Sequence, residues 1–145
     1  AYRDALRREA VALPGAVELM RALHAAGYAQ ALGSSAPVEN LDLIVQLLGI
    51  GQYLGAVISG EMVARGKPAP DIFLAAAQRL GVVAARTLVI EDAPAGVAAA
   101  HAGGMRCLAV RRAGQADPEG LDAADAIVDS LRDADVSLVR RLLGQ

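Results

Sequence analysis

Residues 87–110 read TLVIEDAPAGVAAAHAGGMRCLAV and contain two strand-like runs separated by a helix-like segment. Residues 87–90 are an apolar run of strand length, and residues 105–110 are a second one. Between them, residues 94–102 begin with proline, are rich in alanine and end before Gly103, as a short helix does. Two short apolar runs joined by a helix predict parallel strands of one sheet.

The same alternation of strand-like and helix-like segments extends outward in both directions. A polar stretch at 114–122 is expected to be a loop, and the rest of the chain alternates around it. We expect further strands at 28–32, 56–59 and 126–128, and helices at 16–26, 37–48, 71–80 and 131–143. This order predicts an α/β fold with a doubly wound parallel sheet, covered by helices on both faces.

Composition bounds the function. The chain has 145 residues, enough for one domain, with 54% hydrophobic and only 3% aromatic residues, so the core is expected to be aliphatic. A net charge of −2 without a basic stripe argues against nucleic acid, and no apolar run is long enough for a membrane span. Cys107 is the only cysteine, which excludes an intrachain disulfide and fits a cytoplasmic protein.

Polar residues follow the predicted strands at three points. Ligands of such sheets bind at the carboxyl ends of the strands, and Ser34, Lys67 and the pair Glu91-Asp92 lie there or in the adjoining loop. Ser34 can donate to a phosphate oxygen near the backbone N–H groups of the next helix; alternatively, Ser34 and Ser35 only cap that helix.

Lys67 lies in the rigid loop Gly66-Lys67-Pro68 and is the only lysine among 14 basic residues. A fixed ammonium group suits phosphate and an acidic partner, whereas the alternative is a solvated surface lysine. Glu91 and Asp92 repel each other unless a cation lies between them. Carboxylates of this kind suit Mg²⁺; alternatively, Asp92 is the N-cap of the following helix.

Several motifs resemble those of haloacid dehalogenase-like hydrolases, in the subfamily of sugar-phosphate phosphatases and β-phosphoglucomutases. The resemblance rests on GKPAPDIF at 66–73, LVIEDAPAGV at 88–97, LGSS at 32–35, LPGAVEL at 13–19 and ADAIV at 124–128. It therefore covers nearly the whole chain in the family's order.

The resemblance implies a role for each candidate residue. Ser34, helped by the amide of Ser35, would bind the transferring phosphoryl group, and Lys67 would neutralise its charge and orient the nucleophile. Asp92 would bind Mg²⁺, with Glu91 as a second ligand or the holder of a metal-bound water. The implied reaction is Mg²⁺-dependent hydrolysis of a small phosphate monoester, of sugar-phosphate or phosphoglycolate type, through an aspartyl-phosphate.

The family's first motif, Asp-x-Asp-x-Thr, does not occur in the chain. Asp133-Ala134-Asp135 is the only Asp-x-Asp and is expected to be a solvated turn or helix start. The resemblance then implies that residues 1–12 are the end of a helical cap domain and that residues 13–145 are a core domain without its first strand. We expect two unpaired strands in the sheet, a first strand supplied by a missing segment or a partner chain, and no turnover by this chain alone.

Two other functions stay open from the sequence. A β-phosphoglucomutase-type phosphomutase shares the three motifs, and a non-catalytic phosphate-binding module would use Ser34 and Lys67 alone; a dehalogenase is disfavoured by Glu91-Asp92. Structural roles are expected for the remaining chemically active side chains. They are His24 and His101, Cys107 as a small buried residue, and Arg111-Arg112 as a solvated strand end. Alternatively, the two arginines lie at the fringe of a phosphate site.

Overall fold

The computed structural model describes residues 13–112 and 119–145, so the expectations for residues 1–12 and most of the 114–122 loop lie outside the described residues. Helices and strands alternate as expected. The strands are β1 (Ala31–Ser34), β2 (Ala56–Ser59), β3 (Leu88–Glu91), β4 (Arg106–Val110) and β5 (Ala126–Val128). The helices are α2 (Ala16–Ala25), α3 (Val38–Leu48), α4 (Asp71–Leu80), α5 (Pro94–Ala102) and α6 (Val136–Leu142).

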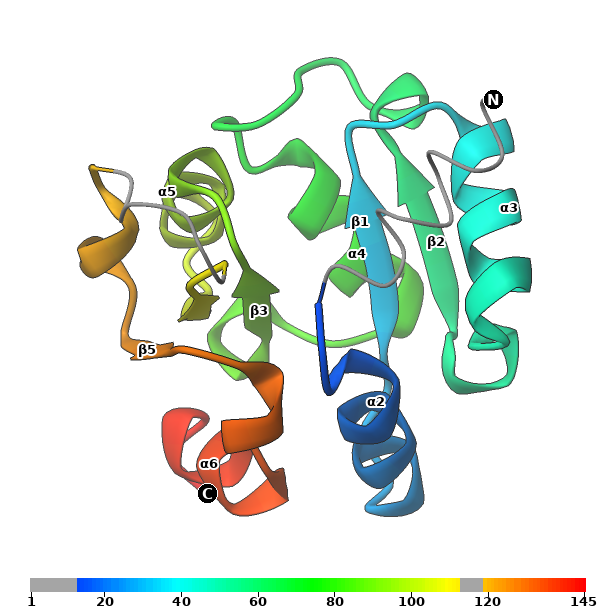
Figure 1. Cartoon of the computed structure of the whole chain (residues 1–145). Coiled ribbons are helices and arrows are strands. Elements are labelled where there is room, and N and C mark those ends of the chain that lie inside the picture. Colours follow the sequence, from blue (N-terminus) through cyan, green and yellow to red (C-terminus); the bar gives the residue numbers. More distant parts are fainter. Residues whose placement is uncertain (1–12, 113–118) are drawn as a thin grey trace.

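All strand pairs are parallel, but they form two sheets instead of one. One sheet has the order β1-β2, with Ala31 opposite Ala56 and Ser34 opposite Ser59. The other has the order β3-β4-β5 (Figure 1). Within the described residues, β1 and β3 are therefore edge strands that do not pair with each other. The α/β fold is as predicted, and the expected break falls between the strands that carry Ser34 and Glu91.

Helices cover both faces, and the alternation of side chains along β4 shows it. Cys107 and Ala109, both fully buried, pack in one apolar cluster with residues of α4 and α5. Leu108 and Val110 point to the other face, where they join Leu19 of α2 in a second cluster that includes residues of α6. Because successive residues of a strand point to opposite faces, β4 packs against the helices on both faces of its sheet.

Two predicted elements are shifted. The strand expected at 28–32 is Ala31–Ser34, because its length is set by pairing with the four residues of β2. The helix expected at 131–143 is divided, since Ala134 is extended between a 3₁₀ turn and α6. Asp135 is the N-cap of α6 and accepts a hydrogen bond from the N–H of Leu138 at 2.8 Å, so the Asp-x-Asp string is indeed a helix start.

No described helix is long and apolar enough to cross a membrane. Cys107 is a small buried residue of β4, as expected, and this burial raises the pKa of its thiol to about 12, with smaller contributions from Glu91 and Asp125.

Candidate phosphate and metal site

Lys67 is held in an ion pair at the edge of the sheet. It lies in the loop between β2 and α4, and its Nζ is 2.9 Å from Oε2 of Glu91, the last residue of β3. The Nζ atom also lies 4.7 Å from the centre of the Phe73 ring, a cation–π distance. The two charged side chains are 16% and 11% exposed, so Lys67 is not a solvated surface lysine.

The Glu91 carboxylate is fixed on both oxygens. Oε2 accepts from Lys67, and Oε1 accepts from the backbone N–H of Asp92 at 3.1 Å. Gly96, in the first turns of α5, makes room for it: a Cβ at Gly96 would lie 2.0 Å from Cδ of Glu91. Gly96 is a site residue that the sequence analysis missed, and its signal was a glycine inside a predicted helix.

Asp92 does not cap the helix that follows. The N-cap of α5 is Ala93, without a side-chain hydrogen bond. The Asp92 carboxylate instead accepts from Nε of Arg112, which lies just beyond β4. Arg112 thus contacts a candidate site residue, which favours the alternative that the two arginines lie at the fringe of the site over the alternative of a solvated strand end.

Ser34 is the last residue of β1, and its Oγ accepts from the N–H of Ala36 at 3.2 Å. The N-cap of α3 is Pro37, without a side-chain hydrogen bond, so Ser34 and Ser35 form a turn before the helix and do not cap it. Ser35 lies in this turn, close against Gly60: a Cβ at Gly60 would approach the Ser35 carbonyl oxygen to 2.9 Å.

A buried serine on the neighbouring strand holds the same turn. The Oγ of Ser59, fully buried at the end of β2, donates to the Ala36 carbonyl at 2.6 Å and accepts from the N–H of Glu61 at 3.1 Å. The carboxylate of Glu61 in turn accepts from the N–H of Val38 at 3.1 Å. Sequence reasoning missed Ser59 and Glu61, because their contacts lie 23 positions away.

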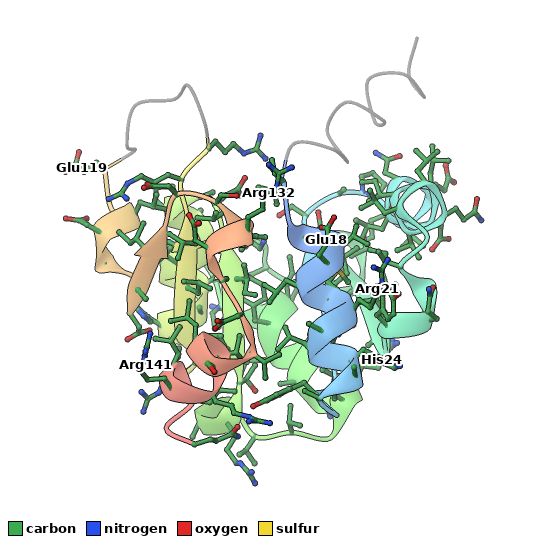
Figure 2. All side chains as sticks on the ribbon, turned by 60° about the horizontal axis from the view of Figure 1, so that its bottom comes forward. Glu18, Arg21, His24, Glu119, Arg132 and Arg141 are labelled. Atoms are coloured by element: carbon green, nitrogen blue, oxygen red, sulfur yellow. The ribbon has the colours of Figure 1, made fainter. Side chains whose placement is uncertain are left out.

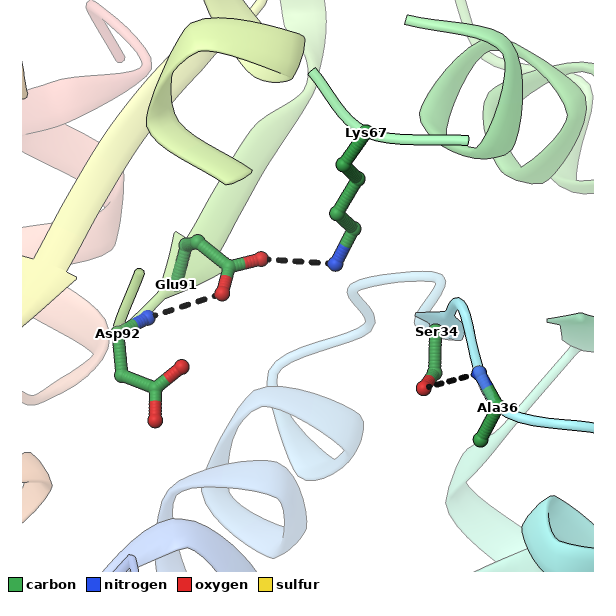
Figure 3. A network of polar contacts seen from close by, with 5 residues as sticks. All are labelled: Ser34, Ala36, Lys67, Glu91 and Asp92. Carbon is green, nitrogen blue, oxygen red and sulfur yellow. Dashed lines mark hydrogen bonds and ion pairs between the residues drawn. The ribbon is translucent and has the colours of Figure 1, made fainter. Parts of the chain in front are cut away.

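These side chains converge from the carboxyl ends of both sheets. Figure 3 shows the Lys67 ammonium pointing into the space between Glu91 and Ser34, with the Asp92 carboxylate directed away from Lys67. Lys67 and Glu91 are thus joined in one ion pair, whereas Ser34 and Glu91 end strands of different sheets. The roles predicted for these residues stay predictions.

The acidic residues at this edge offer a partial ligand set for a metal ion. Within residues 13–112 and 119–145, no group of three or more His, Cys, Asp or Glu side chains is placed to hold a metal. Mg²⁺ commonly takes one or two carboxylates together with water and phosphate oxygens. Asp92 fits such a donor set, and Glu91 beside it is already held by Lys67.

A groove of about 500 Å³ lies elsewhere, between α2 and the segment leading into α6. Glu18 of α2 and Arg132, which are both labelled in Figure 2, line this groove. Its lining includes none of Ser34, Ser35, Lys67, Glu91 or Asp92, so it is separate from the predicted site.

Comparison with known proteins places the chain in a family. The haloacid dehalogenase-like hydrolase family matches residues 2–104, and the chain belongs to this family. It is 38% identical over 135 residues to protein SUPPRESSOR OF QUENCHING 1, chloroplastic, of Arabidopsis thaliana, covering 92% of this chain and 12% of that protein. It is 35% identical over 126 residues to hexitol phosphatase A of Escherichia coli K12, covering 87% of this chain and 57% of that enzyme.

A solved structure agrees with these relatives. A haloacid dehalogenase family hydrolase from Deinococcus radiodurans R1, crystallised with bound phosphate and sodium, superposes with a TM-score of 0.79 at 33% identity. The match covers 90% of this chain and 60% of that one. The chain therefore spans little more than half the length of the phosphatase and the hydrolase structure that it resembles.

Proposed function

We propose that the protein containing this chain hydrolyses a small phosphate monoester, of sugar-phosphate or phosphoglycolate type, and that this chain provides the phosphate- and magnesium-binding part of the site. The observation that carries the proposal is the ion pair between Lys67 and Glu91, with Asp92 next to Glu91 and with Ser34 across from the Lys67 ammonium group in Figure 3. Membership of a hydrolase family and the likeness to a phosphatase support it.

The phosphoryl group would lie between Ser34 and Lys67. The Ser34 hydroxyl, now turned to Ala36, and the Ser35 amide would donate to the phosphoryl oxygens, while Lys67 compensates their negative charge. Glu91 fixes the direction of Lys67, whose side chain is 16% exposed. Catalysis of phosphoryl transfer depends mainly on such positioning and charge compensation.

Asp92 would hold Mg²⁺, assisted by Glu91 directly or through water. When bound, the ion supplies further compensation of the charge that develops on the transferring phosphoryl group.

The nucleophilic aspartate would come from a strand outside these 145 residues, either in another segment of the protein or in a partner chain. The division into two sheets supports this part of the proposal, because the facing edges of β1 and β3 have backbone groups that a parallel strand would pair. Such a strand would end beside Ser34 and Glu91, the last residues of β1 and β3. An aspartate there would reach the same phosphoryl group and form the aspartyl-phosphate.

Phosphate release from sugar phosphates and phosphoglycolate tests the proposal. The full-length protein should release phosphate with Mg²⁺ and lose the activity with a chelator or with Lys67→Met. Arg65, which forms an ion pair with Asp71 and is 71% exposed, provides the control. The variant Arg65→Gln should retain activity. Turnover by the pure 145-residue chain would refute the external nucleophile, and a full-length protein without phosphatase activity would refute the function.

A further inference from the structure

The two carboxylates at the sheet edge each have a cation of their own. Lys67 neutralises Glu91, and Arg112 neutralises Asp92 through its Nε–H. The four side chains together carry no net charge. A divalent cation that approaches Asp92 therefore meets a carboxylate whose charge is already paired, so the guanidinium group competes with the cation for this carboxylate.

The two ion pairs differ in how easily they open. Lys67 is 16% exposed and is held by the Phe73 ring as well as by Glu91. Arg112 is 42% exposed, and its partner Asp92 is 19% exposed, more than the 11% of Glu91. Exposed ion pairs are weak, because water replaces the partner at little cost. Of the two ion pairs, the one between Arg112 and Asp92 is therefore expected to open at the lower cost.

We propose that Arg112 is a built-in competitor of the metal at Asp92, an inference that rests on the proposed magnesium site. In the metal-free protein the guanidinium group of Arg112 binds the Asp92 carboxylate and reduces the electrostatic repulsion between the carboxylates of Glu91 and Asp92. Binding of Mg²⁺ releases Arg112 into solvent. By linkage, the ion pair lowers the affinity for Mg²⁺ by the same factor by which Mg²⁺ weakens the ion pair.

Arg111 provides a matched control. It is the adjacent arginine, and its Nη1 is 2.9 Å from Oδ1 of Asp129. Arg111→Gln removes the same charge from nearly the same place without removing the partner of Asp92. A general change of electrostatic potential would affect both variants alike, whereas competition for Asp92 affects Arg112→Gln alone.

The test is the dissociation constant of Mg²⁺, measured by calorimetry on the full-length protein. We expect Arg112→Gln to lower it by roughly three- to tenfold, Arg111→Gln to change it by less than about twofold, and Asp92→Asn to abolish binding. A second readout is the Nε–H resonance of Arg112, whose hydrogen exchange with water should become faster at saturating Mg²⁺.

The results of these measurements distinguish failure of the competition by Arg112 from failure of the proposed magnesium site at Asp92. If the parent protein binds Mg²⁺ and Asp92→Asn does not, but Arg112→Gln leaves the affinity unchanged or weaker, competition is refuted and the magnesium site stands. Unchanged exchange at Arg112 Nε on binding would refute competition equally. If the parent protein does not bind Mg²⁺, both the site and the inference fail.

Discussion

The Nζ atom of Lys67 lies 2.9 Å from Oε2 of Glu91, across 24 positions of sequence. Both side chains are mostly buried, and removal of either one leaves the other charged and short of a partner. Lys67→Met or Glu91→Gln should each lower the free energy of unfolding by roughly 1.5–3 kcal/mol, as hydrogen bonds to charged groups do. Urea unfolding of the single and double variants gives the coupling, expected to be about 1–3 kcal/mol.

The exposed pair Arg65–Asp71 is the control for this cycle. Its atoms lie 3.1 Å apart, yet the Arg65 side chain is 71% exposed. Its coupling should stay below about 1 kcal/mol. Equal coupling for the two pairs would mean that burial does not strengthen the Lys67–Glu91 contact.

Gly96→Ala should disturb the site through Glu91. The new Cβ would overlap Cδ of Glu91 at 2.0 Å, so the carboxylate must move away from Lys67. We expect a loss of about 1–3 kcal/mol in stability and a Lys67–Glu91 coupling close to zero in this background. Gly51→Ala, whose nearest contact would be Val45 at 3.5 Å, should change stability by less than about 1 kcal/mol. Full Lys67–Glu91 coupling in Gly96→Ala would show that the glycine is not needed for this contact.

Ser59→Ala should loosen the turn that carries Ser34. The buried hydroxyl donates to the Ala36 carbonyl and accepts from Glu61, and its loss leaves both groups without that partner. A cost of about 1–3 kcal/mol is expected, together with weaker binding of inorganic phosphate. Ser137→Ala, at an exposed position of α6, should cost less than about 0.5 kcal/mol in the same unfolding experiment and leave phosphate binding unchanged. Phosphate affinity that survives Ser59→Ala would contradict a role for this turn.

Asp125 is expected to contribute to the loss of folding stability at low pH. Burial opposes its ionisation, but hydrogen bonds from the Cys107 N–H at 2.7 Å and from His101 outweigh this and lower the pKa of the carboxyl. A lowered pKa stabilises the folded state above the unfolded-state pKa, about 3.9, and that contribution disappears as the pH falls through the folded-state pKa.

Asp125→Asn should therefore lose less unfolding free energy than the parent between about pH 5 and about pH 3. His101→Gln, which keeps the Cys107 hydrogen bond, should lie between the two. The same pH dependence in the parent and in Asp125→Asn would show that this contact does not contribute.

Local patterns predicted the strands and the residues at their ends. Ser34 and Glu91 follow apolar runs, and glycine ends the helices on either side, so chain direction and sheet topology bring both residues to one edge. The interpretation of Lys67 as a fixed cation agrees with its ion pair to Glu91. The expected break in the sheet agrees with the structure, since β1 and β3 do not pair within the described residues.

Contacts between distant segments were not predictable in the same way. Arg112 reaches Asp92 across 20 positions, and no periodicity indicates which of two adjacent arginines turns toward Asp92 and which toward Asp129. The support of Ser34 by Ser59 depends on the register of β1 against β2, which is fixed by tertiary packing. The observed bounds of β1 differ from the predicted ones because they are set by its pairing with the four residues of β2.

A crystal structure of the full-length protein with Mg²⁺ and phosphate would show whether Ser34, Lys67 and Asp92 form one site. We predict phosphate within hydrogen-bonding distance of the Ser34 hydroxyl and Lys67 ammonium, Mg²⁺ on the Asp92 carboxylate, and a strand bearing an aspartate between β1 and β3. Phosphate bound away from Ser34 and Lys67 would refute the proposed phosphate site. A strand in that position without an acidic residue at its carboxyl end would refute the proposed nucleophile.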